Sequence, residues 1–201
     1  MAADGDPRDD EVRRLVARCL KDDQAAVGEL VARYNHQVFG LCFRMLGQRQ
    51  DAEDVSQESF VRAIRGLPGW DSQRDFAPWL LAIAGNRCRT FLAARARRPR
   101  PTDAVDDLAD GRPDTERASN LAEEVDLALT GVRYEYRQAF VLFHDQQLSY
   151  AQIAETMGCP LGTVKTWVHR ARHELVERLR QRGVVAERGV VTEHGSALRR
   201  V

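Results

Sequence analysis

Apolar residues recur at spacings of three and four along most of the chain, whereas alternating, strand-like patterns are nearly absent. This periodicity predicts helices, and Gly47 and the Pro68-Gly69 pair supply breaks between them. In the first half of the chain we expect four helices, at about Glu11–Leu20, Gln24–Leu46, Asp51–Gly66 and Phe76–Arg98.

The composition changes after residue 98. Prolines and a glycine punctuate the next stretch, where no packed element is expected. Between Asp103 and Asp126 there are nine acidic residues and two arginines, a net charge of −7. We interpret this stretch as a flexible acidic linker.

Helical patterns resume near Ala118, continue through Arg137–His144 and end in a helix pair within Leu148–Arg182. The expected fold class is all-α, with two small helical domains joined by the flexible acidic linker and a helix-turn-helix at the end of the C-terminal one. The expected organisation is an acidic leader with the first helix at 1–23, a first domain at 24–98, the linker at 99–117, a second domain at 118–182 and a poorly ordered tail at 183–201.

The helix pair within Leu148–Arg182 has the pattern of a helix-turn-helix, whose second helix enters the major groove of DNA. A tight turn at Gly158-Cys159-Pro160 separates the two helices. The second helix carries one apolar stripe, made of Leu161, Val164, Val168, Ala171, Leu175 and Leu179. Polar and basic residues lie largely off this stripe, at Lys165, Thr166, His169, Arg170 and Arg172. An ordinary helical hairpin with a solvated basic face would leave the same pattern.

The whole-chain composition limits the kinds of partner and the cellular compartment that we expect. Thirty basic and thirty acidic residues cancel, and 28 of the basic ones are arginine, whose planar fork suits phosphate and carboxylate partners. The four cysteines, Cys19, Cys42, Cys88 and Cys159, are widely spaced and no secretory leader is evident, which indicates reduced thiols in a cytoplasmic protein. No apolar run approaches the ~20 residues that span a bilayer, so no membrane insertion is expected.

The third predicted helix gathers acidic residues on one face. Asp51, Asp54 and Glu58 share it, with Gln57 at its margin. Favourable interaction with the helix dipole makes a solvated first turn a sufficient explanation. A docking face for a basic partner explains the crowding equally well.

A basic run precedes the linker, and aromatic residues lie just upstream of it. The run contains Arg87, Arg89, Arg95, Arg97, Arg98 and Arg100 and no acidic residue. Arginines beside aromatic rings are typical of single-strand binding, because bases stack on the rings. We expect Phe76 and Trp79 to anchor the fourth helix in the core. Trp70, in the Pro-Gly loop, is open to either role.

Three segments in this order resemble the extracytoplasmic-function (ECF) sigma factors of bacterial RNA polymerase. They read DAEDVSQESFVRAI, FAPWLLAIAGNRCRTFL and LSYAQIAETMGCPLGTVKTWVHRARHEL. The resemblance covers about Gln24–Arg98 and Leu121–Arg182. It implies a sigma factor that binds core RNA polymerase and initiates transcription at a specific set of promoters, without catalytic residues, cofactor or metal.

The resemblance also assigns roles to residues. The face that would dock on the coiled coil of the polymerase β′ subunit comprises Asp51, Asp54, Gln57 and Glu58. Residues that would capture the melted −10 promoter element are Trp70, Asp71, Arg74, Asn86, Arg87 and Arg89. Residues that would read the −35 element in the major groove are Thr163, Lys165, Thr166, His169, Arg170 and Arg172. Further implied partners are the β subunit and an anti-sigma factor, and the linker would thread the RNA exit channel.

Some positions depart from the family pattern. Trp167 stands where relatives often carry a small or basic residue, so either packing or DNA contact is open for it. Arg74-Asp75 and the tail after Arg182 follow no pattern that we can interpret.

Three alternatives explain less of the chain. A helix-turn-helix regulator that never docks on polymerase leaves the acidic helix and the aromatic-arginine segment unexplained. A serine recombinase needs an α/β catalytic domain, and no strands precede the motif to build one. His169 and His173 lie four residues apart, but the glutamate of an HExxH zinc site is missing between them.

The segregation of charge suggests a closed free state. The acidic stretch Asp103–Asp126 lies between the arginine run and the basic helix Lys165–Arg182, and tethering raises its effective concentration to the millimolar range. We therefore expect the free protein to be compact and a poor DNA binder. Screening of surface charge should loosen this compaction as salt rises.

Overall fold

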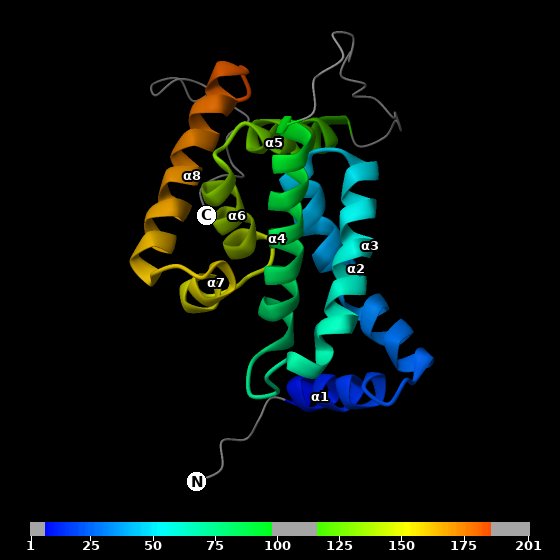
Figure 1. The fold of residues 1–201 in the computed structure, drawn as a ribbon. Coiled ribbons are helices and arrows are strands. Elements are labelled where there is room, and N and C mark those ends of the chain that lie inside the picture. Colours follow the sequence, from blue (N-terminus) through cyan, green and yellow to red (C-terminus); the bar gives the residue numbers. More distant parts are fainter. Residues whose placement is uncertain (1–6, 98–115, 186–201) are drawn as a thin grey trace.

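The computed structural model describes residues 7–97 and 116–185, and in these ranges the regular structure is entirely helical (Figure 1). The N-terminal domain comprises α1 (Pro7–Cys19), α2 (Gln24–Leu46), α3 (Arg49–Gly66), the 3-10 turn η1 (Leu67–Gly69) and α4 (Phe76–Arg97). The C-terminal domain comprises α5 (Glu116–Thr130), α6 (Tyr134–His144), α7 (Tyr150–Met157) and α8 (Leu161–Gln181). The expected all-α class with two helical domains is confirmed.

Local signals begin and end these helices. The Asp23 carboxylate caps α2 by accepting a hydrogen bond from the Ala26 backbone N–H at 3.1 Å, and Gly47 ends this helix. Ser149 and Gln152 form a capping box that starts α7. Gly158 ends α7 with a φ of 63°, a left-handed conformation that glycine adopts without strain. The turn between α7 and α8 is therefore fixed by its own residues.

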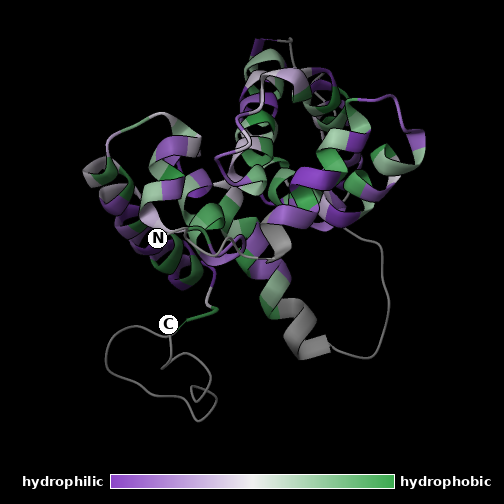
Figure 2. Ribbon diagram, turned by 90° about the horizontal axis from the view of Figure 1, so that it is seen from below, coloured by the Kyte–Doolittle hydropathy of each residue, from purple (hydrophilic) through white to green (hydrophobic). Residues whose placement is uncertain are grey.

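The helices bury most of the expected apolar faces. Hydrophobic and hydrophilic positions alternate along the helices, as the colouring by hydropathy shows (Figure 2). One residue of the expected apolar stripe of α8 differs. Leu161 is 43% exposed because it stands in the first turn of α8, beyond the helices that cover the rest of the stripe. The helices α1, α3, α5 and α6 also begin two to four residues earlier than the periodicity indicated.

The two domains share one hydrophobic core. A single cluster of buried residues runs from α1–α4 into the C-terminal domain, where it includes Leu142, Leu148, Ile153, Val164 and Val168. In Figure 1, α4 stands between the other N-terminal helices and the group α6–α8. It contacts α7 directly, and α2 contacts α5 and α6. The sequence predicted the two domains but not this packing.

Most of the predicted linker, and the tail after residue 185, lie outside the described residues. The last two linker positions, 116 and 117, belong to α5. The first tail residues differ from the expectation of poor order, because Val184 and Val185 pack against a second, smaller core between α5, α6 and α8. The Val184 backbone N–H also donates to the Leu179 carbonyl at 2.9 Å.

Candidate nucleic-acid interfaces

The helix α8 presents a polar face opposite its buried stripe. Val164, Val168 and Ala171 are almost fully buried against α6 and α7. The residues predicted to face DNA are exposed at positions 165, 166, 169, 170 and 172, while Thr163 is half-buried. Because α7 and the Gly158 turn fix the start of α8, this face is held on a rigid support. Its geometry suits insertion of a helix into a groove.

Tyr136 on α6 holds one of these residues in place. The Arg170 Nη1 donates to the Tyr136 hydroxyl at 2.8 Å, and this hydrogen bond, followed by the charge of Arg170, lowers the pKa of Tyr136. The guanidinium groups of Arg133 and Arg170 lie 5.2 and 5.8 Å from the centre of the Tyr136 ring. The sequence analysis missed Tyr136, which carries no motif of its own.

Trp167 packs within the domain. Its half-buried ring lies 6.5 Å from the Tyr136 ring, centre to centre, and it contacts both hydrophobic cores. The question left open by the sequence is thus answered in favour of packing.

Arg172 is turned toward its own domain. Its guanidinium donates to the His144 Nε2 at 3.1 Å and lies over the Phe143 ring at 5.7 Å. Burial, and then the charge of Arg172, lowers the pKa of His144, which favours the neutral imidazole that can accept this bond. Arg172 is therefore held on α6, as Arg170 is through Tyr136.

The acidic face of α3 is partly engaged by arginines of α4. Asp54 and Gln57 are exposed, whereas Asp51 pairs with Arg95 at 3.2 Å and Glu58 pairs with Arg87. Burial opposes ionisation of Glu58, but hydrogen bonds from Arg87 and Arg62 outweigh it and lower the pKa of this carboxyl. The sequence suggested two separate charged faces, and the structure joins them along the α3–α4 contact.

The loop between η1 and α4 packs on a cluster of aromatic rings. The Trp70 ring meets the Phe76 ring edge-on at 5.3 Å, and Phe76 lies 5.3 Å from Trp79 and 5.1 Å from Tyr34. Phe76 is 4% exposed, as expected for a core anchor, whereas Trp70 and Trp79 are half-buried. Trp70 therefore belongs to the ring cluster and still reaches the surface.

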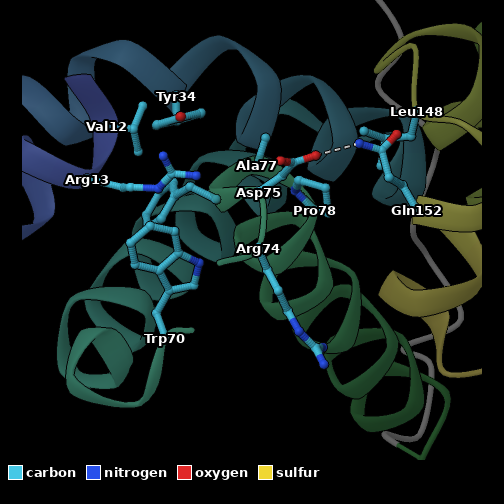
Figure 3. Close-up of a pocket in the computed structure, with 11 residues that line it drawn as sticks. Val12, Arg13, Tyr34, Trp70, Arg74, Asp75, Ala77, Pro78, Leu148 and Gln152 are labelled. Atoms are coloured by element: carbon cyan, nitrogen blue, oxygen red, sulfur yellow. Dashed lines mark hydrogen bonds between the residues drawn. The ribbon is translucent and has the colours of Figure 1, made fainter. Parts of the chain in front are cut away.

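Polar residues shape the rest of this loop. The Asp71 carboxylate accepts from the Gln73 backbone N–H at 3.0 Å and pairs with Arg74 at 3.3 Å. Trp70, Arg74 and Asp75 line a cavity of about 190 Å³, which Arg13 of α1 and Gln152 of α7 close (Figure 3). The sequence gave no hint of this cavity, because its walls come from both domains.

The predicted DNA-facing residues of α4 differ in exposure. Asn86 is exposed, and Arg87 keeps 18% of its side chain accessible because it turns toward Glu58. The Arg89 guanidinium lies over the Tyr134 ring of α6 at 5.7 Å. The structure thus brings the predicted −10 residues Arg74 and Arg89 against the C-terminal domain.

Other kinds of site are not evident in the described ranges. Within residues 7–97 and 116–185, no cluster of three or more histidine, cysteine or acidic side chains could hold a metal ion. No helix in those same ranges is long and apolar enough to cross a bilayer.

Both domains match known family models. Residues 30–98 match the model described as Sigma-70 region 2, and residues 122–175 match the one described as Sigma-70, region 4. The chain is 31% identical to the ECF RNA polymerase sigma factor SigW of Bacillus subtilis (strain 168), covering 84% of this chain and 97% of that relative. It is 36% identical to the ECF RNA polymerase sigma-E factor of Escherichia coli (strain K12), covering 80% and 90%.

Two solved structures are similar in fold to this chain over most of its length. The structure of CnrH in complex with the cytosolic domain of CnrY is similar with a TM-score of 0.64 and 27% identity, over 84% of this chain and 97% of that one. RpoE from Bartonella quintana, solved with the anti-sigma factor NepR, has a TM-score of 0.61 and 21% identity, over 76% and 96%, which is a likeness of fold alone.

Proposed function

Because this chain belongs to the ECF sigma factors of bacterial RNA polymerase, we propose that it docks on core polymerase through α3, captures the −10 element with α4 and the preceding loop, and reads the −35 element with α8. Sigma factors are non-enzymatic transcription initiation factors. We assign this chain no catalytic residue of its own, and place its action in the cytoplasm.

The observation that carries this proposal is that one chain has two distinct surfaces, each suited to a different form of DNA. The α8 face is rigid, exposed and polar, which suits duplex readout. The α4 segment combines arginines with a cluster of aromatic rings, which suits unpaired bases. A helix-turn-helix regulator that acts alone would need only the first surface, so the alternative of a regulator without polymerase docking is not favoured.

The docking face is assigned to Asp51, Asp54, Gln57 and Glu58 on α3. Asp54 and Gln57 are its exposed members. The ion pairs of Asp51 with Arg95 and of Glu58 with Arg87 orient the other two carboxylates without hiding them fully. A basic surface on the β′ subunit would meet a pre-arranged acidic row.

Anti-sigma factors are proposed as further partners. The similar structures of CnrH and RpoE were each solved as complexes, with the cytosolic domain of CnrY and the anti-sigma factor NepR. The similarity to CnrH covers both domains of this chain. A protein that binds across both domains would therefore find a surface of similar shape here.

The proposal is tested by recovering the DNA that the chain selects. Core polymerase mixed with the purified chain should be captured on a tag carried by the chain, together with fragments of genomic DNA. The retained fragments should share two short elements at a fixed separation. Retention of fragments with a single element, independent of core polymerase, would instead support the regulator.

A smaller effect is expected from Tyr136→Phe, which keeps the ring under Arg170 and removes the hydroxyl that accepts its hydrogen bond. Loss of one such bond should weaken binding of −35 duplex by roughly fivefold, about 1 kcal/mol. Tyr150→Phe is the matched control, because it likewise removes one tyrosine hydroxyl and keeps the ring, which stacks on Phe143. Fluorescence anisotropy with a −35 duplex measures both, and equal affinities of the two variants would remove Tyr136 from this role.

A further inference from the structure

Arg172 of α8 is tied to the end of α6 by a neutral histidine. Its Nε donates to the His144 Nε2 at 3.1 Å, and its Nη2 lies 3.0 Å from the same atom. A guanidinium can only donate, so the His144 Nε2 must supply the lone pair and the imidazole hydrogen must be on Nδ1. A protonated imidazole has no lone pair to offer. The contact therefore requires an uncharged His144.

Aromatic rings fix the imidazole in this position. The Phe140 and Phe143 rings lie 4.4 and 5.0 Å from the His144 ring, centre to centre. Phe143 also stacks on Tyr150 of α7 at 4.7 Å, and the Arg172 guanidinium lies over Phe143 at 5.7 Å. The acceptor for Arg172 is thus held firmly in the last turn of α6.

Two charged groups act on His144 in addition to its burial. Burial lowers the pKa of His144 most, Arg172 of α8 lowers it further, and Asp145 at the end of α6 raises it. Asp145 is itself paired with Arg44 of α2 at 3.1 Å. The pKa of His144 therefore lies below the ordinary value of about 6.5, and the imidazole of the free chain is neutral at neutral pH.

A DNA phosphate would compete with His144 for the same guanidinium. Arg172 is exposed on the helix assigned to the −35 duplex. The edge formed by its Nε and Nη2, which can bind a phosphate with two hydrogen bonds, faces the His144 Nε2. A charged phosphate oxygen is a stronger acceptor than a neutral imidazole. A phosphate that takes this edge displaces His144.

We propose that His144 is a positioning residue for Arg172: neutral His144 retains the arginine on α6, and protonated His144 releases it to a phosphate of the −35 duplex. This rests on the proposed function of α8. Release removes a cation from beside the imidazole, so the pKa of His144 rises in the complex. DNA binding therefore takes up a proton, and the affinity for duplex rises as the pH falls through the range between the two pKa values.

Arg170 provides an internal contrast. It is held on α6 by the Tyr136 hydroxyl, which accepts its hydrogen bond at 2.8 Å. This oxygen keeps lone pairs whether or not the hydroxyl is ionised, so it can accept from Arg170 in either state. Release by a proton is therefore specific to Arg172.

The test measures binding of the full-length chain to a DNA duplex at low salt and at two pH values, by fluorescence anisotropy. A random duplex of about 30 base pairs suffices, because phosphate contacts do not depend on sequence. His144→Gln keeps an acceptor near the position of Nε2 and cannot take up a proton, whereas His144→Phe removes the acceptor. His36→Gln on α2 is the matched control, because His36 is exposed and lies outside every proposed DNA contact.

The diagnostic quantity is the difference between the wild type and His144→Gln, because His169 and His173 on α8 are also exposed and can add a pH response of their own. His144→Gln should match the wild type at about pH 7.5 and bind roughly fivefold more weakly than it at about pH 5.5, since one unit of pKa corresponds to tenfold. His144→Phe should bind several-fold more tightly than the wild type at the higher pH. His36→Gln should match the wild type at both.

A double-mutant cycle shows whether His144 acts through Arg172. In the Arg172→Ala background, His144→Gln should leave the pH response unchanged, whereas a charge that merely attracts DNA would act in both backgrounds. NMR titration of the imidazole Cε1–H signals is the second readout. In it, the pKa of His144 in the wild type should rise when duplex is added.

Equal pH responses of the wild type and His144→Gln, or a His144 pKa that duplex leaves unchanged, would overturn the positioning role. If His144→Gln loses its helical circular dichroism, His144→Phe decides by the same comparison of pH responses. The outcome is separable from the proposed function. Duplex binding without a contribution of His144 to the pH response rejects this role and leaves α8 as the DNA-binding helix, whereas absence of duplex binding by the wild type at both pH values rejects both.

Discussion

Replacing Asp54 by arginine should abolish binding to core polymerase and leave the fold unchanged. Asp54 is exposed at the centre of the acidic face on α3, so the change reverses a charge at the proposed contact without touching the core. Exposed substitutions usually alter the free energy of unfolding by less than about 0.5 kcal/mol. Glu58 is a poorer target, because its reversal would place two guanidinium groups together at Arg87.

The measurement is co-purification with core polymerase, beside a thermal melt of the isolated variant. Glu177→Arg is the control, since Glu177 is an exposed acid on α8 outside every proposed contact with core polymerase. We expect this control to bind core polymerase as the wild type does. Undiminished capture of Asp54→Arg would remove α3 from the docking role.

The second large effect distinguishes the two proposed DNA-binding surfaces by whether the −10 region of the template is paired or already melted. Arg170→Ala should weaken promoter binding by about 1–3 kcal/mol, roughly five- to 150-fold, on any template that carries a duplex −35 element. Trp70→Ala should lose a comparable amount on fully paired DNA, since stacking of one base contributes about 1–3 kcal/mol. Trp70 stands at the edge of the ring cluster, where a base of an opening duplex could stack.

A template with a premelted −10 region should therefore restore initiation by Trp70→Ala and not by Arg170→Ala. The rescue is its own control for folding, because a misfolded variant would fail on both templates. Equal rescue of the two variants, or rescue of neither, would contradict the division of labour.

The periodicity of apolar residues was enough to predict the helices and the helix-turn-helix. It placed Val164, Val168 and Ala171 on the buried side of α8 correctly, because helical spacing alone decides which side faces the core. It failed for Leu161, since a position in the first turn is covered only if a neighbouring helix extends that far.

The contacts between elements could not be predicted from the sequence. Arg87 and Glu58 were assigned to different partners, because they lie 29 residues apart and nothing in their spacing shows that α3 and α4 pack side by side. Tyr136 and Gln138 belong to no functional motif. Tyr136 matters because its hydroxyl accepts a hydrogen bond from Arg170, and Gln138 because its side chain packs against Gly85. The Ser149–Gln152 capping box can be recognised in the sequence as the start of α7. The motif does not indicate that the Gln152 amide also donates a hydrogen bond to Asp75.

The central claim is that this chain gives core polymerase the ability to start transcription at chosen promoters. Run-off transcription with purified core polymerase tests it most directly, on a template recovered from the genomic selection. Core polymerase alone should be silent, and addition of the chain should yield a transcript of one defined length. Failure of the wild-type chain to produce this transcript, under conditions in which a known sigma factor activates the same core polymerase on its own promoter, would contradict the account.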